Sequence, residues 1–263
     1  MTQHRRFVDR VVLVTGAGSG IGKAAAQELA VEGAKVGVLS KSEKNVAATV
    51  QEIEAAGGTA LPLIADVRRE DDINNAVQQI DDTWGRLDGV VVNAGINGVW
   101  APITDLTLEE WDTTISTNLT STFLTVKAAT PLLKRQGGAI AITASVNGTR
   151  IFSNTGASAY STSKAGQVAF AKMAALELAR FRIRVNVVCP GWITTNIDEA
   201  TYPRNLESVK IPVEFPQGFQ PLEGGPGTPR QVAQLFAFLL SDDASHISGT
   251  EMWIDGTESL LIG

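Results

Sequence analysis

The sequence has very few of the residues that build disulfide frameworks and transition-metal sites. Its 263 residues include one cysteine, Cys189, and two histidines, His4 and His246. A single cysteine excludes an intrachain disulfide. Two histidines at opposite ends of the chain, without a Cys/His cluster of zinc spacing, argue against a metal site. Because Cys189 ends an apolar run just before Pro190, we expect a buried and chemically inert thiol.

Long apolar runs and an excess of positive charge are also lacking. No segment approaches the roughly 18 apolar residues of a membrane span. The apolar residues near the start are interrupted by Asp9 and Arg10, which argues against a signal peptide, so we expect a cytoplasmic protein. Lys and Arg number 22 against 28 Asp and Glu, giving a net charge of −6. This balance argues against non-specific binding to nucleic-acid phosphates.

What is present is a regular alternation of short Val- and Ile-rich runs with longer segments of helical period. This pattern is typical of a parallel sheet covered by helices on both faces. We predict one α/β domain over residues 1–263, a doubly wound (Rossmann) fold with a seven-stranded parallel sheet. The expected strands are 10–15, 35–39, 60–64, 89–93, 138–143, 184–188 and 251–254. The expected helices are 22–32, 44–56, 71–84, 108–133, 159–181 and 228–240.

Residues 192–227 interrupt this rhythm with five prolines and several glycines. No stretch of domain size follows, so the segment reads as an irregular excursion rather than a linker. Long loops of this kind commonly cover binding sites, and we expect a substrate loop here. A variable surface loop is the alternative.

The first expected strand leads directly into a glycine-rich turn, Thr15-Gly16-Ala17-Gly18-Ser19-Gly20-Ile21-Gly22. Glycines allow a tight turn and a close approach of the backbone to a ligand. The free N–H groups and the positive dipole at the start of the next helix favour a pyrophosphate. The turn therefore predicts a dinucleotide site.

Tyr160 and Lys164 are four residues apart near the start of an expected helix, so both side chains project from one face. A lysine ammonium beside a phenol favours the phenolate and is expected to lower the tyrosine pKa from about 10. Ser145 follows an expected strand, at the edge where doubly wound folds bind ligands, and can bond a substrate oxygen. The alternative is a tyrosine packed beneath an exposed lysine.

Five features occur together in a fixed order: the glycine turn, Asn93-Ala94-Gly95, Ser145, Tyr160-x-x-x-Lys164 and Pro190-Gly191. In their order and spacing, residues 10–256 resemble the short-chain dehydrogenase/reductase family. The resemblance implies that Ser145 orients the substrate oxygen and that Tyr160 transfers the proton. It also implies that Lys164 binds the nicotinamide ribose.

The resemblance extends to a fourth catalytic residue, Asn118, which matches the family asparagine that holds a water molecule in the proton relay. One departure is that Ser145 and Tyr160 are fifteen positions apart, two more than is typical of the family. We interpret the extra residues, within 147–158, as a longer substrate loop.

The cofactor-binding residues that the resemblance implies come from the glycine turn, from the ends of several strands and from the Tyr/Lys pair. They are Gly16, Ser19, Gly20, Ile21, Gly22, Asp66, Val67, Asn93, Ala94, Gly95, Tyr160, Lys164, Pro190, Gly191, Ile193 and Thr195.

The choice between NADP and NAD depends on the end of the second strand. An acidic residue there would bind the adenosine ribose of NAD. Ser40 stands in that place, and Lys41 can pair with a phosphate, which favours NADP(H). Glu43 is close enough to replace the missing acid, so NAD(H) stays open.

Together these features predict an oxidoreductase that interconverts a ketone and a secondary alcohol, with reduction by NADPH favoured and without a metal. One alternative is a 3-oxoacyl-[acyl-carrier-protein] reductase, for which Arg150, Arg204 and Lys210 could provide a basic docking surface. Another is a scaffold that senses a dinucleotide without turnover.

The substrate is not specified by any motif, and we expect a hydrophobic ketone or alcohol as a small-molecule partner. The resemblance also implies a homotetramer or homodimer built partly on the helices that contain Asn118 and Tyr160. The side chains that could line an apolar pocket are Trp100, Ile151, Phe152, Trp192, Tyr202, Phe215 and Phe219.

Overall fold

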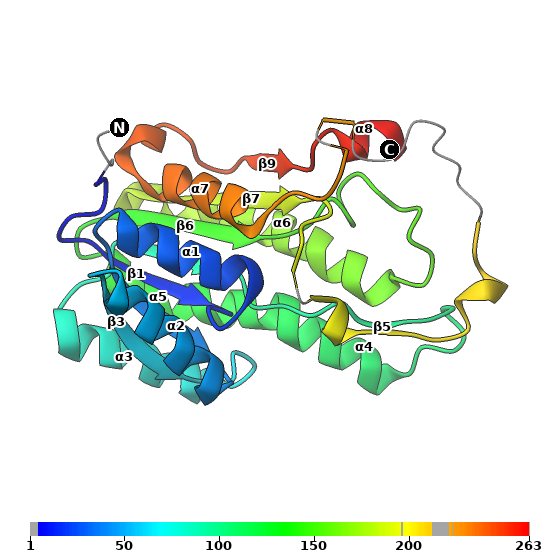
Figure 1. Ribbon diagram of the computed structural model, residues 1–263, viewed down its shortest axis with the longest axis horizontal. Coiled ribbons are helices and arrows are strands. Elements are labelled where there is room, and N and C mark those ends of the chain that lie inside the picture. The colour runs from blue at the N-terminus through cyan, green and yellow to red at the C-terminus, as the bar shows by residue number, and fades with distance from the viewer. Residues whose placement is uncertain (1–4, 196, 212–220, 223, 263) are drawn as a thin grey trace.

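The computed structural model describes residues 5–195, 197–211, 221–222 and 224–262. Its centre is a seven-stranded, fully parallel sheet in the order β3-β2-β1-β4-β6-β7-β9 (Figure 1). This confirms the predicted fold class. The strands are β1 (Val11–Thr15), β2 (Lys35–Ser40), β3 (Thr59–Ile64), β4 (Gly89–Val92), β6 (Gly138–Thr143), β7 (Ile183–Pro190) and β9 (Glu251–Ile254).

Helices cover both faces of the sheet. One face carries α1 (Gly20–Val31), α2 (Glu43–Ala55) and α7 (Pro229–Leu240), which lie in front in Figure 1. The other face carries α3 (Glu70–Trp84), α5 (Ser121–Leu133) and α6 (Ser158–Leu178). Two more helices, α4 (Leu108–Ile115) and α8 (Glu258–Ile262), lie beyond the carboxyl ends of the strands. None of the helices in the described ranges is long and apolar enough to span a membrane.

The sheet separates two apolar cores, and β1 shows how the sequence supplies both. Val11 and Leu13 pack against α3, α5 and α6, whereas Val12 and Val14 pack against α1, α2 and α7. Side chains of a strand alternate between the faces, so a strand buried on both sides must be apolar throughout. This is why the inner strands of the sheet appear in the sequence as short Val- and Ile-rich runs.

The helix predicted over 108–133 has its predicted bounds, but it is not an α-helix throughout. A π-helical turn, Ser116–Thr120, separates α4 from α5. The carbonyl of Asn118 in this turn accepts hydrogen bonds from Thr122 Oγ1 at 2.7 Å and from Gln167 Nε2 at 3.0 Å. Such turns insert one residue into a helix and often lie at functional sites. Helical periodicity does not report them, because the flanking turns keep their pattern.

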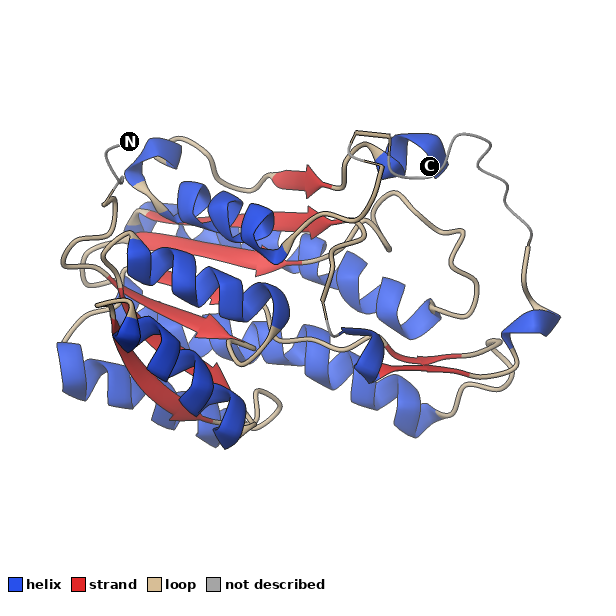
Figure 2. Ribbon diagram, viewed as in Figure 1, coloured by secondary structure: helices blue, strands red, loops and turns tan. Residues whose placement is uncertain are grey.

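The segment 192–227 is less irregular than predicted, because it contains a strand. β8 (Thr201–Pro203) pairs in parallel with β5 (Gly98–Trp100), beyond the end of the main sheet (Figure 2). The base of the segment is closed by two bonds, from the Gly227 N–H to the Trp192 carbonyl and from the Thr194 N–H to the Gly227 carbonyl, both 2.9 Å. Three-residue strands are too short to show an alternation, so the sequence did not reveal them.

Candidate active site

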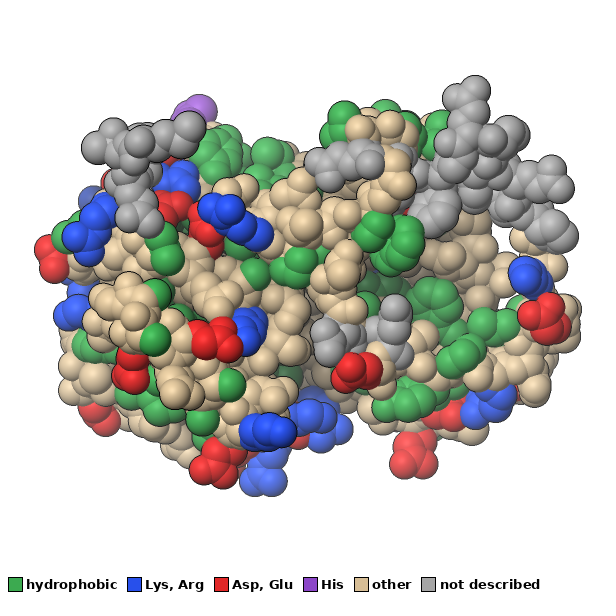
Figure 3. Space-filling view, in the orientation of Figure 1, with side chains coloured by type: hydrophobic (Ala, Val, Ile, Leu, Met, Phe, Trp, Pro, Cys, Tyr) green, Lys and Arg blue, Asp and Glu red, His purple; other side chains and the backbone are tan. Residues whose placement is uncertain are grey.

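A cavity of about 620 Å³ opens at the carboxyl ends of the strands, where the order reverses between β1 and β4. Its volume is in the range of small-molecule and cofactor sites, and its position is the usual ligand crevice of doubly wound sheets. Figure 3 shows that the molecule is hollowed on this side. One end of the cavity lies between the glycine turn and the ends of β2 and β3. The other lies among β5, the loop before α6 and the described residues of the segment after β7, which are Trp192, Ile193, Thr195, Ile197 and Ala200.

The glycine turn has the geometry that a bound pyrophosphate requires. Gly16 has φ +67°, and a Cβ there would lie 2.9 Å from the Cα of Ala94. At Gly22 a Cβ would lie 2.2 Å from the Gly16 carbonyl oxygen, so this glycine allows α1 to pack against the turn. Ser19 caps α1 without a side-chain bond, which leaves the first N–H groups of the helix to a ligand. These residues fit a dinucleotide.

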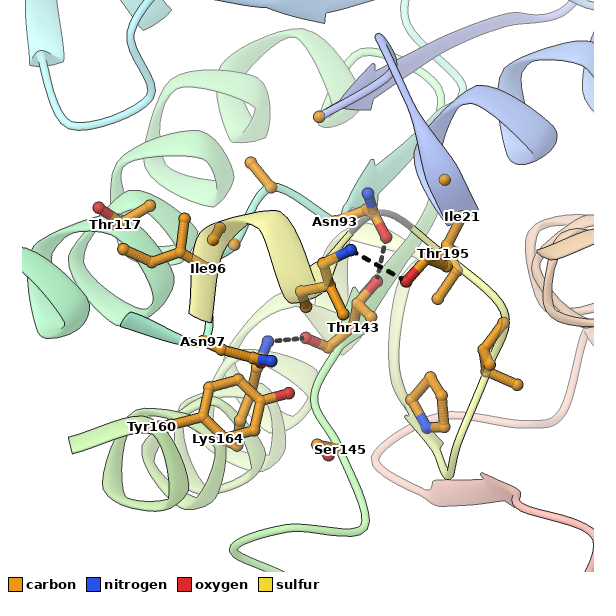
Figure 4. A pocket seen from close by; sticks show the side chains of 18 of the residues that line it. Ile21, Asn93, Ile96, Asn97, Thr117, Thr143, Ser145, Tyr160, Lys164 and Thr195 are labelled. Carbon is orange, nitrogen blue, oxygen red and sulfur yellow. Dashed lines mark hydrogen bonds between the residues drawn. The ribbon is translucent and has the colours of Figure 1, made fainter. Parts of the chain in front are cut away.

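Thr15, which the sequence analysis did not single out, fixes the next part of the cavity wall. Its Oγ1 accepts the N–H groups of Asn93 and Ala94 at 3.0 and 3.2 Å. The Thr143 hydroxyl donates to Asn93 Oδ1 at 3.2 Å (Figure 4). The ends of β1, β4 and β6 are therefore connected by side-chain bonds. A threonine that ends a strand gives no pattern of its own, which is why it was missed.

Lys164 and Tyr160 project from α6 into the middle of the cavity (Figure 4). Lys164 Nζ donates to the Thr143 carbonyl at 2.9 Å and lies 5.6 Å from the centre of the Tyr160 ring. Both side chains are buried, with 4% and 7% exposed. Burial lowers the pKa of Lys164 to about 8.

The Tyr160 pKa does not follow the sequence-based prediction. Burial raises the Tyr160 pKa above 10, and the neighbouring Ser145 side chain offsets only part of the rise. The expected lowering by Lys164 is therefore wrong for this state of the protein. The ammonium is itself desolvated and bonded to a carbonyl, so loss of water around the phenolate outweighs its attraction.

Ser145 is held at the end of β6, beside Tyr160. Its Oγ accepts the backbone N–H of Asn147 at 3.1 Å, and its side chain acts to lower the pKa of Tyr160. Two hydroxyl groups are thus brought together over the strand ends. An oxygen of a bound molecule placed between them would receive hydrogen bonds from both.

Asn118 does not line the cavity but lies behind it. Its Oδ1 accepts the Ile96 N–H at 2.9 Å, and its Nδ2 donates to the Ile96 carbonyl and to Ser163 Oγ, each at 2.9 Å. The side chain therefore joins the loop after β4 to α6. Its role in a water relay stays a prediction.

The adenosine end of the cavity carries two basic side chains, Lys41 and Arg68. Arg68 donates to both carboxylate oxygens of Asp66, and this bond lowers the Asp66 pKa, with a smaller effect of Lys41 in the same direction. Glu43, the acid that could have replaced the one missing at Ser40, begins α2 and does not line the cavity. Arg68 was missed because it follows the third strand rather than the second.

The opposite end differs from the predicted apolar pocket. Trp100, Ile151 and Trp192 line it, but Phe152 and Tyr202 are 70% and 60% exposed and lie outside the lining. The expected Phe215 and Phe219 fall outside the described residues. Three polar residues that were not predicted also line this end: Asn97, Asn147 and Asn154.

Most of the residues predicted as catalytic or cofactor-binding therefore meet in one cavity, and among these Gly22 and Asn118 are the two that do not line it. The predicted residues that line it are Gly16, Ser19, Gly20, Ile21, Ser40, Lys41, Asp66, Val67, Asn93, Ala94, Gly95, Ser145, Tyr160, Lys164, Pro190, Gly191, Ile193 and Thr195.

The basic residues considered for docking an acidic partner are largely engaged within the chain. The Arg150 guanidinium stacks on the Trp253 ring at 3.7 Å and donates to Ser259 Oγ at 3.3 Å. Arg204 pairs with Glu110 at 2.6 Å. Cys189 is buried, which confirms that part of the prediction, and burial raises its pKa to about 12, which disfavours the reactive thiolate.

Comparisons with known proteins agree with this site. Residues 16–257 match the family described as Enoyl-(Acyl carrier protein) reductase. A solved structure of a 3-ketoacyl-ACP reductase from Sinorhizobium meliloti 1021 is 49% identical, with a TM-score of 0.91 over 95% of this chain and 99% of that one. Levodione reductase of Leifsonia aquatica is 37% identical over 97% of this chain and 96% of its own length. Cyclohexanol dehydrogenase of an Acinetobacter species is 38% identical over 95% of this chain and 95% of its own length.

Proposed function

The chain belongs to the short-chain dehydrogenase/reductase family, and we propose that it interconverts a ketone and a secondary alcohol with NADP(H), reduction being favoured. Its relatives include named dehydrogenases and reductases, and it is an oxidoreductase of the class that acts on CH–OH groups. The observation that carries the finer proposal is the buried Tyr160, which lies beside Lys164 and lines the same central cavity as Ser145.

The chain's own residues bind the substrate oxygen and move a proton. A nicotinamide, when bound, supplies or accepts the hydride. Ser145 and Tyr160 hold the carbonyl oxygen, and the Tyr160 hydroxyl donates its proton as negative charge develops there. Because burial raises the Tyr160 pKa, the phenol is protonated at neutral pH, which is the state that reduction needs. The Lys164 ammonium then stabilises the phenolate that remains.

The preference for NADP(H) is supported by charge at the adenosine end. Lys41 and Arg68 both line this end, and Ser40 stands where an acid would repel a ribose phosphate. Arg68 is paired with Asp66, so Lys41 is the cation with more of its charge left to a phosphate. A reducing, cytoplasmic location fits the single buried thiol and a reduced cofactor.

The experiment that tests this function is titration of the protein with NADPH and NADH, followed by turnover of a ketone panel monitored at the absorbance band of the reduced cofactor. We expect tighter binding of NADPH, turnover of at least one ketone, and loss of about 10³-fold or more in kcat for Tyr160→Phe. Ketone turnover that survives Tyr160→Phe would overturn the mechanism. Cofactor binding without turnover of any compound would instead favour a dinucleotide sensor.

A second candidate is reduction of a 3-oxoacyl thioester on an acyl carrier protein. It is favoured by the 49% identical structure and by a 36% identical 3-oxoacyl-[acyl-carrier-protein] reductase of Thermotoga maritima. Comparing kcat/KM for an acetoacetyl thioester with that for simple ketones separates the two. A 2-enoyl thioester in the same panel tests the activity that the family description names.

A further inference from the structure

Three asparagines line the end of the cavity beyond Tyr160. Asn97 immediately precedes β5, Asn147 lies two residues after Ser145, and Asn154 lies in the loop before α6. They come from three separate segments of the chain, and Figure 4 shows Asn97 in the same region of the cavity as Tyr160 and Lys164. An amide group that a bound substrate covers from water requires a hydrogen-bonding partner on that substrate.

Asn147 and Asn154 are hydrogen-bonded to each other, and the pair leaves one amide NH₂ group and one amide carbonyl oxygen unused. Asn154 Nδ2 donates to Asn147 Oδ1 at 2.9 Å. No other described residue bonds the remaining NH₂ of Asn147 or the carbonyl oxygen of Asn154. If both amides were turned over, the pair would still keep one unused NH₂ group and one unused carbonyl. The pair therefore presents a donor and an acceptor side by side.

Asn97 offers a fixed acceptor. It is 9% exposed, and its Nδ2 donates to Thr201 Oγ1 at 2.8 Å. Because the Thr201 hydroxyl itself donates to the Ile197 carbonyl at 3.1 Å, it can only accept from Asn97, which sets the orientation of the amide. Within the described ranges, Asn97 Oδ1 accepts no hydrogen bond, and it belongs to the cavity wall.

We propose that the substrate is a hydroxylated ketone, or the matching diol, whose additional hydroxyl binds among Asn97, Asn147 and Asn154. The inference rests on the proposed function and names its substrate class. A hydroxyl donates one hydrogen bond and accepts others, so it satisfies both the NH₂ group and a carbonyl oxygen. An ether or a second ketone only accepts, and it leaves the carbonyl oxygens unpaired.

The charges at this end point to a neutral substituent rather than an anionic one. Among the described residues that line it, Lys164 is the one basic side chain, and its Nζ is bonded to the Thr143 carbonyl. Glu258 contributes a carboxylate that accepts the Trp192 N–H at 3.0 Å. The one basic side chain of this end is thus already engaged beside Tyr160, and no second cation among the described lining residues is left there to bind a carboxylate or phosphate of the substrate.

The test compares matched ketones with wild-type protein and NADPH. The probes are cyclohexanone, its 2-, 3- and 4-hydroxy derivatives, and the methoxy ketones substituted at the same positions. We expect at least one hydroxy ketone to exceed both its methoxy partner and cyclohexanone by about tenfold or more in kcat/KM. The methoxy series controls for the electronic effect of an oxygen substituent on the carbonyl.

Turnover of these ketones with no preference for a hydroxyl at any position would overturn the inference and leave the proposed function standing. Absence of turnover for every ketone, including cyclohexanone, would overturn the proposed function and the inference with it. The two failures are therefore distinguishable in one set of assays.

Variants assign the preference to residues. Asn147→Leu and Asn154→Leu keep the approximate volume of the side chain and remove its amide, and each is expected to bring the hydroxy/methoxy ratio close to one. Phe152→Ala is the matched control, because Phe152 lies in the same loop but is 70% exposed and outside the lining. An unchanged ratio in both leucine variants would overturn the assignment. If neither variant folds, the kcat/KM ratios of the wild-type protein still test whether the substrate carries an additional hydroxyl.

Discussion

At the scale of the residue, the clearest property of the site is that burial acts on Tyr160 and Lys164 in opposite senses. It raises the pKa of the phenol and lowers that of the ammonium to about 8. Both shifts follow from the cost of a buried charge. The site therefore holds a neutral acid beside a base that loses its proton within an accessible pH range.

The first prediction concerns pH. Ketone reduction needs a protonated Tyr160 and is assisted by a charged Lys164, so kcat/KM for NADPH at saturating ketone is expected to be constant near neutral pH. It is expected to fall above about pH 8, where Lys164 becomes neutral. The measurement is a pH–rate profile of wild type and Lys164→Met. The variant should be slower throughout and lack the fall near pH 8; a wild-type profile flat to pH 10 would contradict the assignment.

Lys41 gives a second prediction at this scale. Lys41→Ala is expected to raise the Kd of NADPH by about tenfold, the loss of one charge-assisted contact, and to leave that of NADH nearly unchanged. Fluorescence titration at low salt measures both constants. Lys44→Ala is the matched control, since Lys44 carries the same charge on exposed α2 and does not line the cavity. Equal effects on the two cofactors would show that Lys41 does not contact a ribose phosphate.

Sequence reasoning at the residue scale succeeded where a motif fixes both residue type and spacing. The glycine turn, Ser145, Tyr160 and Lys164 all line the cavity. Sequence reasoning failed where the conformation of a loop determines which residues meet at the cavity. Asn147 and Asn154 are paired only because the loop before α6 folds back, and Arg68 reaches the cavity only because β3 ends beside β2. Neither the asparagine pair nor the position of Arg68 produces a periodicity or a residue spacing in the sequence from which it could be predicted.

At the scale of the element, the excursion after β7 is secured to the main body by Arg204. The guanidinium donates to both carboxylate oxygens of Glu110 on α4 and to the Asp105 carbonyl. These bonds join the residue after β8 to the start of α4, next to the substrate end of the cavity. The sequence analysis assigned Arg204 to a docking surface, because a long-range partner cannot be identified from a basic residue alone.

The third prediction follows from this ion pair. Arg204 and, to a smaller extent, the Thr107 N–H lower the pKa of Glu110 from 4.5 to about 2. These bonds therefore stabilise the folded state above pH 4.5, and their contribution is lost as the pH falls from 4.5 to about 2. Arg204→Met is expected to remove the part of the pH dependence of folding stability that comes from the bond with Glu110. Because the segment after β8 then loses its attachment to α4, we also expect a higher KM for substrate and faster proteolysis within 197–211. Acid titration by circular dichroism and limited proteolysis measure these effects.

The control for Arg204 is Lys210→Met, which removes a positive charge from an exposed position of the same segment. It should leave the acid transition and the proteolysis rate as in wild type. If both variants behave alike, the effect belongs to net charge and not to the bond with Glu110.

At the scale of the whole molecule, the two faces of the sheet present different surfaces. α5 and α6 expose large apolar side chains, including Phe123 at 46%, Met173 at 67% and Leu176 at 78%. Phe123 also packs edge-on against Phe170, which extends the apolar surface from one helix to the other. Contiguous exposed apolar surface of this kind marks interaction sites in folded proteins. These are the helices on which the family resemblance predicts assembly.

The last prediction is that the protein forms a homodimer or homotetramer through this α5/α6 face. In a two-fold assembly each face meets its own copy, so one substitution places two charges in the same buried contact. Leu176→Glu is therefore expected to shift the molar mass in solution to a smaller species, measured by light scattering after size exclusion at several concentrations. Val31→Glu, at a 42% exposed position on α1 across the sheet, should leave the mass unchanged. A wild-type protein that stays monomeric at every concentration, or a Leu176→Glu variant with the wild-type mass, would show that this face does not mediate assembly.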